Sequence, residues 1–300
     1  MAVHIPVLLK EVLDNFTPAP GQKYIDCTAG EGGHSLAIAK LVAPNGGVLS
    51  INADPQELEL FRSNIEDAGL EGVIEAVHGN YTDIEEIADK YGFISPNGIL
   101  FDLGFSSWQL ERSGRGFTFQ KQEPLDMRFN PRDENKETAA YIVNNASKDH
   151  LVWILKEYGE EGRAEKIAEA IVEARAKEKI KTTGDLVNII SQAGIGGGKI
   201  SPATKTFQAL RIAVNNELEN IKKGLDAAID ITANKGKIAV ISFHSLEDRI
   251  IKQTFKRWDK EGRGDNITKK VIQPQYSETR ENPRARSAKL RIFKKIIKNN

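Results

Sequence analysis

A glycine-rich stretch early in the chain has the residue types of a nucleotide-binding turn. It runs Asp26-Cys-Thr-Ala-Gly-Glu-Gly-Gly-His-Ser35, directly after the apolar pair Tyr24-Ile25. A strand that ends in such a turn and continues as a helix presents backbone N–H groups and the positive end of the helix dipole to a ligand. Glycines at 30, 32 and 33 also permit positive φ angles and close approach of the backbone. The turn alone is weak evidence, because strand-to-helix turns use glycine for structural reasons as well.

The elements around this turn predict a sheet that would gather polar residues at one edge. Apolar runs indicate strands at 24–25, 48–52, 73–78 and 99–101, and helical patterns lie between them at 36–39, 55–68 and 84–91. This alternation predicts an α/β fold with a doubly wound, mostly parallel sheet, in which ligands bind beyond the carboxyl ends of the strands. The residues near those ends are Gly30 to His34, Asn52, Tyr81, Asp102 and Gln109.

The middle of the chain has a different pattern. From about residue 107 to 204 the strands stop, and helical spacing appears at 148–158, 163–175 and 183–193. We therefore expect a discontinuous sheet domain, residues 1–110 and 207–300, and an inserted helical subdomain, residues 111–206. One long helix is expected from 206 to 229, then a strand at 237–243. Ser245 and Asp248 resemble a capping box at the start of the next helix.

The composition is typical of a globular protein without disulfide bonds or membrane segments. The 300 residues are 40% hydrophobic and 28% charged, as in an ordinary globular chain. The single Cys27 excludes an internal disulfide framework, and its place beside an apolar strand predicts a buried, inert thiol in a reducing cytoplasm. We expect no signal peptide and no membrane segment, since no run of about 18 apolar residues occurs. The five histidines lack ligand spacing, so no metal is expected.

Charge is balanced overall but unevenly distributed. The segment from Arg249 to the end carries 16 lysines and arginines against 5 acidic residues, whereas residues 1–100 carry 5 against 15. The basic segment is either a solvated, disorder-prone tail or a landing surface for a phosphate backbone. Arg284 and Arg286 favour the second interpretation.

Nine sequence motifs are spread over nearly the whole chain. They are His4-Ile-Pro-Val-Leu-Leu-Lys-Glu11, Asp26 to Ser35, Asp102-Leu-Gly-Phe-Ser-Ser-Trp-Gln-Leu110, Arg115-Gly-Phe-Thr-Phe119, Pro124-Leu-Asp-Met-Arg128, Tyr158-Gly-Glu-Glu161, Thr206-Phe-Gln-Ala-Leu-Arg-Ile212, Phe243-His-Ser-Leu-Glu-Asp-Arg249 and Asn282-Pro-Arg-Ala-Arg-Ser287. Read together, these motifs resemble those of the RsmH (MraW) family. The members of this family are bacterial S-adenosylmethionine-dependent methyltransferases that act on cytosine N4 in small-subunit rRNA.

The resemblance implies a class I methyltransferase fold, a Rossmann-like doubly wound sheet, with a helical insertion for RNA recognition. It implies S-adenosylmethionine as cofactor and a decoding-centre cytosine of 16S rRNA, within the small ribosomal subunit, as substrate. Whether the chain acts as a monomer or a homodimer is left open. Asp102 is the first candidate for a catalytic role. By matching position, the cofactor contacts are Gly32, Gly33, His34, Asn52, Tyr81, Asp102 and Gln109.

Two of these positions depart from the family pattern. The family usually has aspartate where this chain has Asn52, and phenylalanine where it has Tyr81. An amide still accepts from a ribose hydroxyl but lacks the charge, which predicts a loss of roughly 1 kcal/mol in cofactor binding. Asp54 either compensates or serves only as the N-cap of the helix at 55–68.

The expected chemistry is displacement of the sulfonium methyl by the exocyclic amine of cytosine. Holding the base requires acceptors for its N–H protons and, for a splayed-out base, an aromatic platform. Ser106, Ser107 and His244 are weaker candidates than Asp102 for the first task. Trp108, Phe117 and Phe119 either form the platform or lie in the core of the insertion. The proton acceptor is not assigned by the sequence.

Two other functions share part of the pattern. A nicotinamide-dependent oxidoreductase would also use the glycine turn, but it would want a ribose-binding carboxylate at Asn52 and a catalytic Tyr-Lys pair, which the sequence does not show. The second alternative is a non-catalytic ribosome-assembly factor that retains RNA binding while Asn52 weakens the cofactor site.

Overall fold

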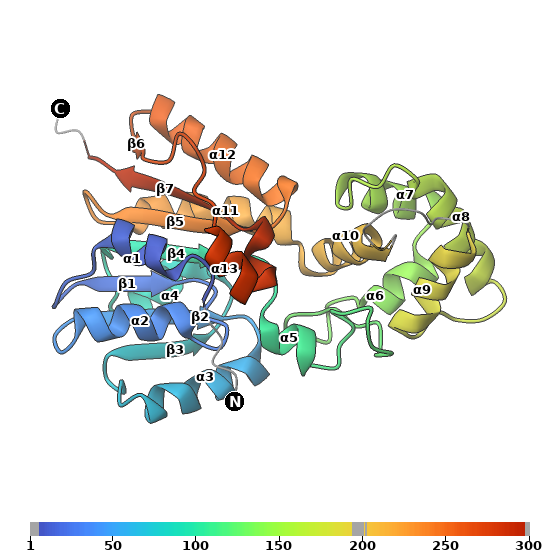
Figure 1. Cartoon of the computed structure of the whole chain (residues 1–300), viewed down its shortest axis with the longest axis horizontal. Helices are drawn as coiled ribbons and strands as arrows, with labels where there is room; N and C mark the ends of the chain where they lie inside the picture. Colours follow the sequence, from blue (N-terminus) through green and yellow to red (C-terminus); the bar gives the residue numbers. More distant parts are fainter. Residues whose placement is uncertain (1–5, 194–200, 202, 298–300) are drawn as a thin grey trace. The chain divides into compact units, whose positions relative to one another are not determined.

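The computed structural model divides into two compact units (Figure 1). The structure describes residues 6–193, 201 and 203–297. The first unit comprises residues 1–106 and 218–300, and the second comprises residues 107–217. The sequence placed the divisions at 110 and 207. His4, at the start of the first family motif, lies outside the described residues.

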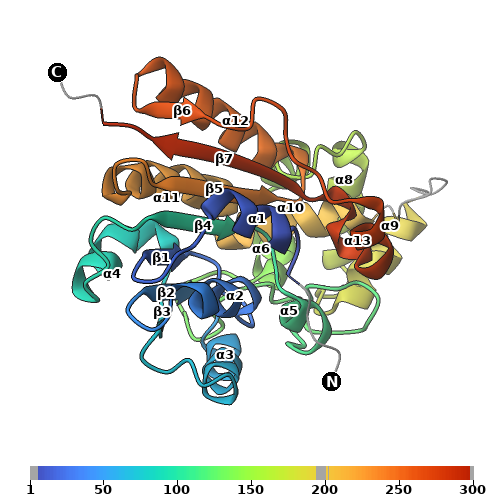
Figure 2. The ribbon, with the colours of Figure 1, turned by 60° about the vertical axis from the view of Figure 1, so that its left-hand side comes forward.

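A seven-stranded sheet forms the centre of the first unit, with strand order β3-β2-β1-β4-β5-β7-β6 (Figures 1 and 2). The first five strands in chain order pair in parallel, and β7 runs antiparallel to both β5 and β6. This confirms the predicted doubly wound, mostly parallel sheet. The strands are β1 Lys23–Asp26, β2 Gly47–Asn52, β3 Ile74–His78, β4 Gly98–Asp102, β5 Lys237–Ser242, β6 Gly264–Asn266 and β7 Lys289–Lys295.

Helices cover both faces of this sheet, because the strands are apolar on both sides. All six residues of β2 are buried, as expected of a central parallel strand. One hydrophobic core includes side chains of α1, α2 and α3, and a second includes side chains of α4, α11 and α12. The helices of this unit are α1 Leu9–Phe16, α2 Gly33–Val42, α3 Pro55–Asp67, α4 Ile84–Lys90, α11 Glu217–Ile231, α12 Ser245–Lys260, α13 Tyr276–Glu281 and the 3₁₀ helices η1 Tyr81–Asp83 and η2 Pro283–Ser287.

Side chains cap the N-termini of helices α3 and α12. Asp54 caps α3 as predicted, because its carboxylate accepts from the N–H groups of Gln56 and Glu57. The predicted box of Ser245 and Asp248 is wrong by one residue. The capping box of α12 is formed by His244 and Glu247.

The predicted long helix from 206 to 229 is two helices. α10 ends at Asn215 and α11 begins at Glu217, and Asn216 between them has a φ angle of 53°. Asparagine tolerates this left-handed conformation better than most residues, so it ends one helix without a proline or glycine signal.

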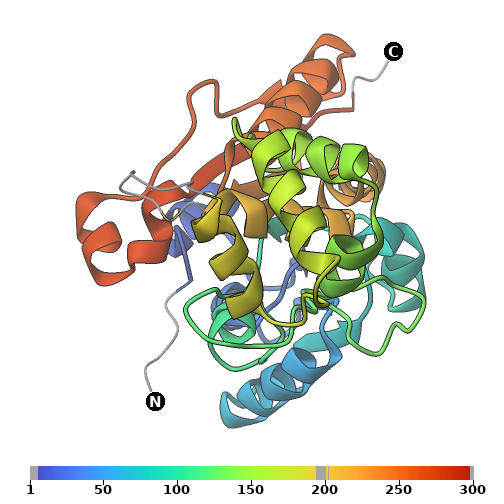
Figure 3. The same cartoon turned by 90° about the vertical axis from the view of Figure 1, so that its right-hand side faces the viewer.

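Helices packed around their own core make up the second unit, which Figure 3 shows in green and yellow. The three helices predicted between residues 148 and 193 are confirmed as α7, α8 and α9. α7 packs against both α8 and α10. The helices are α5 Ser107–Glu111, α6 Ala139–Asn145, α7 Lys148–Glu157, α8 Ala164–Arg175, α9 Thr183–Gln192 and α10 Ala203–Asn215.

Much of the basic C-terminal segment is ordered structure. β7 lies inside the sheet with Leu290, Ile292 and Phe293 fully buried. Arg291 is buried as well, and its guanidinium forms an ion pair with Asp248, 2.7 Å from Nε to Oδ1. The interpretation as a disorder-prone tail is therefore wrong for β7. Among the described residues, no helix is long and apolar enough to span a membrane.

Candidate cofactor site at the sheet edge

The glycine-rich turn lies where the strand order of the sheet reverses. It follows β1, which has β2 on one side and β4 on the other, and connections from such strands leave in opposite directions. Backbone hydrogen bonds tie the turn to both neighbours, from Cys27 N–H to Leu100 O and from Ala29 N–H to Ile51 O. The Thr28 hydroxyl accepts from the N–H of Asp102 at 2.6 Å. The carboxyl ends of β1, β2 and β4 therefore meet at this turn.

Asp26, the last residue of β1, shapes the turn from beneath. Its carboxylate accepts from the Ser35 hydroxyl at 2.7 Å and from the Thr28 N–H at 3.1 Å, and the Ser50 hydroxyl donates onward to Ser35. Complete burial raises the pKa of Asp26, while His34 nearby lowers it. Because its oxygens bind groups of the chain itself, Asp26 positions the turn.

The two glycines predicted to contact the cofactor make room for the protein's own side chains. Gly32 has a φ angle of 93°, and a Cβ on it would lie 1.9 Å from the ring of Phe61. A Cβ on Gly33 would lie 2.4 Å from Pro6 Cγ. Glycine is thus required here by packing as well as by any ligand. Gly32 is the N-cap of α2 and provides no side-chain cap for the first turn of that helix.

His34 and Asp102 come together at the edge, as the sequence predicts. His34 lies in the first turn of α2 and Asp102 at the end of β4, and their Nε2 and Oδ2 atoms are 3.6 Å apart. Three buried atoms of this pair have no hydrogen-bond partner among the described residues. They are the two ring nitrogens of His34 and Oδ1 of Asp102. Buried polar atoms without partners are costly, which marks this pair as a place for a polar ligand.

Asn52 occupies the expected place at the end of β2, but its amide is engaged within the chain. The NH₂ group donates to Gly30 O at 3.1 Å and to Glu57 Oε2 at 3.4 Å. Its Oδ1 accepts from the N–H of Asp54 at 2.9 Å. Asp54 itself is fully buried and caps α3, so it does not replace the missing carboxylate at the strand end.

Glu57 is the residue that the sequence interpretation missed. It lies in the first turn of α3, where an acidic residue is ordinarily explained by the helix dipole. Here it is 1% exposed, with its carboxylate between Asn52 and the glycine turn. Its pKa is raised to about 7, chiefly by burial and also by the Asp54 and Glu31 carboxylates, while Ser106 and Asn52 lower it. The burial of Glu57 is what marks it as a candidate site residue, and this burial cannot be read from the sequence because it depends on the fold.

Tyr81 and Gln109 lie in elements other than the glycine-rich turn. Tyr81 follows β3 in η1, and its ring packs edge-on against Phe101, with 5.4 Å between centroids. Gly224 of α11 leaves the space that this ring fills. Gln109 is buried in α5, in the second unit. Both remain predictions as cofactor contacts.

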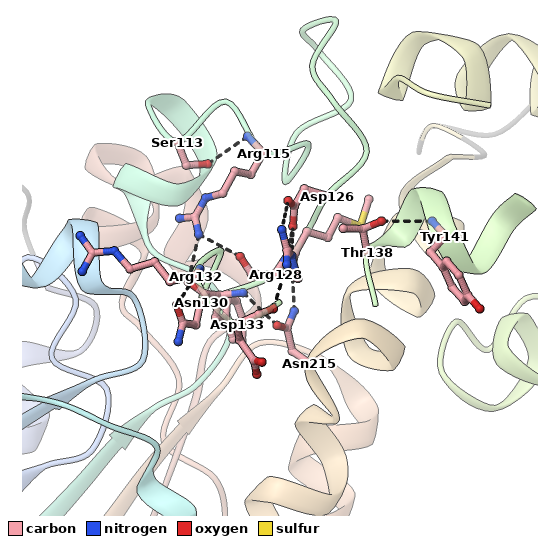
Figure 4. Close-up of polar contacts among 12 residues, drawn as sticks. Ser113, Arg115, Asp126, Arg128, Asn130, Arg132, Asp133, Thr138, Tyr141 and Asn215 are labelled. Carbon is pink, nitrogen blue, oxygen red and sulfur yellow. Dashed lines mark hydrogen bonds and ion pairs between the residues drawn. The ribbon is translucent and has the colours of Figure 1, made fainter. Parts of the chain in front are cut away.

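The family motifs of the second unit form a polar network that Figure 4 shows. Asp126 and Arg128 pair through two hydrogen bonds of 2.8 Å, and Arg128 also donates to the carbonyl of Asp133. Asn215 donates to Met127 O and accepts from the N–H of Phe129. These side chains hold the irregular segment between α5 and α6 in a defined conformation.

The aromatic residues proposed as a base platform pack within the second unit. Phe117 stacks on Phe129 with 5.8 Å between centroids, and Phe119 meets Phe207 edge-on. Arg115 lies over the rings of Trp108 and Phe117. Phe117 is buried, and the half-buried Phe119 packs against the core of this unit, the second of the two alternatives that the sequence left open.

Comparison with known proteins decides the family. A sequence model of the MraW methylase family matches residues 1–296. The chain belongs to the MraW methylase family. The strand order, with β7 antiparallel beside β5, is that of the class I methyltransferase fold predicted from the resemblance. S-adenosylmethionine as the predicted cofactor agrees with membership of this MraW methylase family.

Several curated relatives of this MraW methylase have the same name, ribosomal RNA small subunit methyltransferase H. The protein of Persephonella marina is 44% identical over 299 residues, which cover 99% of this chain and 100% of the relative. That of Thermomicrobium roseum is 43% identical over 309 residues, with coverages of 98% and 94%. A crystal structure of an rRNA methylase from Streptococcus thermophilus is similar with a TM-score of 0.48 and 10% identity, covering 98% of this chain and all of the other.

Proposed function

We propose that this chain transfers a methyl group from S-adenosylmethionine to the exocyclic N4 of a decoding-centre cytosine in 16S rRNA. The family match along residues 1–296 is the observation that carries the proposal, since it includes both the sheet unit and the helical unit. Relatives named as small-subunit rRNA methyltransferases, more than 40% identical along nearly their whole length, support rRNA as the substrate class. The small ribosomal subunit, in the cytoplasm, is the proposed partner.

The residues at the sheet edge fit S-adenosylmethionine. The cofactor presents a ribose diol and an ammonium group, both hydrogen-bond donors, and carries positive charge on sulfur and nitrogen. Within the part of the chain that the structure describes, Asp102 Oδ1, Glu57 Oε1 and both ring nitrogens of His34 are buried without a hydrogen-bond partner. Acceptors and negative charge are the groups that such a ligand needs. The bound cofactor supplies an electrophilic methyl group.

For the transfer itself, Asp102 is the proposed catalytic residue. Its side chain lies at the end of β4, about one fifth exposed, with Oδ1 unpaired among the described residues. A carboxylate there would accept an N–H of the cytosine amine and orient its nitrogen toward the methyl group. His34, 3.6 Å away, would hold that carboxylate in position when protonated. Gly32, Gly33, Asn52, Tyr81 and Gln109 remain proposed cofactor contacts.

Methyl transfer to authentic substrate tests this proposal directly. Small ribosomal subunits from cells that lack the modification would be incubated with labelled S-adenosylmethionine, and the labelled nucleotide mapped. We expect label on N4 of one decoding-centre cytosine. Label on another atom would overturn the N4 assignment. Binding to the particles with no label at all would favour the assembly-factor alternative.

A further inference from the structure

The residue expected to hold the cofactor ribose is poorly suited to do so. The amide hydrogens of Asn52 point to Gly30 O and Glu57 Oε2, and its oxygen already accepts from the Asp54 N–H. The side chain is 6% exposed. Asn52 therefore offers a ligand at most one remaining lone pair, with no negative charge. The usual carboxylate of this strand end is missing at its usual position.

A carboxylate is nevertheless present at the same place, brought there by the next helix. Glu57 reaches back from the first turn of α3 to Asn52, and its Oε1 lies 3.6 Å from where a Cβ on Gly30 would stand. Gly30 has a φ angle of 54°, and 3.6 Å is an ordinary contact distance, so this oxygen lies directly against the turn. Oε1 is buried without a hydrogen-bond partner among the described residues, and the Ser106 side chain near this carboxylate lowers its pKa.

We infer that Glu57 is the ribose-binding residue of this chain, with its carboxylate accepting hydrogen bonds from the cofactor hydroxyls in place of an acidic residue at position 52. Asn52 is then a positioning residue, because its NH₂ group holds Glu57 Oε2 and leaves Oε1 to face the glycine turn. The inference rests on the proposed use of S-adenosylmethionine. Glu57 is not among the cofactor contacts that the sequence predicted, and this inference gives it a contact that determines cofactor specificity.

The ionisation of Glu57 agrees with this role. Its pKa of about 7 results mainly from burial, with Asp54 and Glu31 as the acidic neighbours and the polar groups of Ser106 and Asn52 opposing them. Hydroxyl donors favour the ionised carboxylate, so ligand binding should lower this pKa. Binding near pH 7 should therefore release protons, and affinity should rise as pH increases through 7.

The first test is the affinity of S-adenosylhomocysteine for the full chain, measured by calorimetry. Glu57→Gln removes the charge and keeps the shape, and it should weaken binding between about 10- and 100-fold. Glu59→Gln is the matched control, because Glu59 lies on the same helix with an exposed carboxylate paired to Arg62. It should bind as the wild type does. Equal affinity of Glu57→Gln and wild type would overturn the inference.

A second measurement separates a ribose contact from a general disturbance of the fold. Wild type should prefer S-adenosylhomocysteine over its 2′-deoxy analogue, and Glu57→Gln should lose most of that preference. Titrations at pH 7 in two buffers of different ionisation enthalpy should show proton release by wild type and a smaller release by Glu57→Gln. A variant that binds weakly but keeps the full 2′-hydroxyl preference would contradict the assignment.

Returning the carboxylate to the strand end provides a rescue. The double variant Asn52→Asp with Glu57→Gln should recover affinity to within a few-fold of wild type, since one carboxylate again faces the turn. A folded double variant without recovery would count against an exchange between the two positions. A failure of the proposed function can be distinguished from a failure of the inference about Glu57. Wild type that binds neither S-adenosylmethionine nor S-adenosylhomocysteine would overturn that function, whatever Glu57 does.

Discussion

Two polar clusters of this protein, one in each unit, use their side chains in opposite ways. In the second unit, Asp126 binds Arg128 through two hydrogen bonds, and Arg211 binds Glu217 with Nε and Oε1 2.8 Å apart. At the sheet edge of the first unit, His34 and Asp102 approach each other only to 3.6 Å. Polar atoms of both residues stay buried without a partner among the described residues.

The difference separates side chains that stabilise the fold from those that we propose bind a ligand. A buried charge that is fully bound by neighbours contributes to the shape of an irregular segment, and removing one partner is costly. An unpartnered buried atom lowers the stability of the protein alone and is retained where a bound molecule supplies the partner. Substitutions in the two regions should therefore affect different properties.

The largest effect is expected at the unpartnered site. Asp102→Ala removes a proposed catalytic carboxylate whose one ion pair within the described ranges is with His34, at 3.6 Å. Methyl transfer should therefore fall by about a thousandfold. Thermal unfolding and circular dichroism should stay close to wild type. Retained transfer by Asp102→Ala would remove this residue from the site.

In the second unit the effect should be on stability. Arg211→Met leaves Glu217 buried without its cation, at a cost of between about 3 and 5 kcal/mol in the free energy of unfolding. Lys148→Met provides the control, because Lys148 and Glu169 form an exposed pair in the same unit, worth under about 1 kcal/mol. Urea denaturation of both variants measures the contrast. Equal losses would contradict the distinction between buried and exposed pairs.

Substitution of Glu57 should affect both cofactor binding and the stability of the protein. Its native pKa of about 7 exceeds its ordinary value of 4.5. The folded state therefore holds this proton more tightly than the unfolded state, and the free energy of unfolding should decrease as pH rises from about 4.5 to 7. Glu57→Gln should remove this decrease and stabilise the ligand-free protein at pH 8 by on the order of 3 kcal/mol. Unfolding measured at pH 5 and pH 8 tests it; an unchanged pH dependence would contradict the buried carboxyl as its source.

The smallest effect is expected on the exposed basic surface. Arg284 and Arg286 lie in η2 with exposed side chains. Changing both to alanine should weaken RNA binding a few-fold and reduce the slope of log affinity against log salt by about 1 to 2. Lys40 and Lys90, also exposed but on the acidic N-terminal part, provide a matched pair of control substitutions. An unchanged slope would show that η2 does not contact phosphate.

The sequence predicted the elements whose signals are local. β2 is a continuous apolar run, and Asp54-Pro55 marks the start of α3 by a cap and a proline at the first helical position. The edge residues Asn52 and Asp102 followed from the ends of such strands. Each of these features depends on neighbouring residues alone.

What the sequence did not reveal depends on contacts between distant residues. β7 reads as a polycation because lysines and Arg291 alternate with its apolar residues, and only pairing with β5 shows that Arg291 lies inside, bound to Asp248. Glu57 reads as an ordinary charge in a first helical turn, and burial against β2 and the glycine turn gives it a different role. Asn216 ends a helix by its backbone conformation, which has only a weak sequence signal.

Because of the packing around the glycine-rich turn, its glycines do not by themselves indicate that a protein binds a cofactor. Phe61 and Pro6 fill the space that side chains at Gly32 and Gly33 would need. The turn is thus ordered before a ligand arrives, which avoids an ordering cost of about 1–2 kcal/mol per residue on binding. It also means that a relative with these contacts would have to keep both glycines even after losing the cofactor. The two glycines thus indicate how the turn is packed, whereas His34, Asp102 and Glu57 are the residues that indicate a ligand.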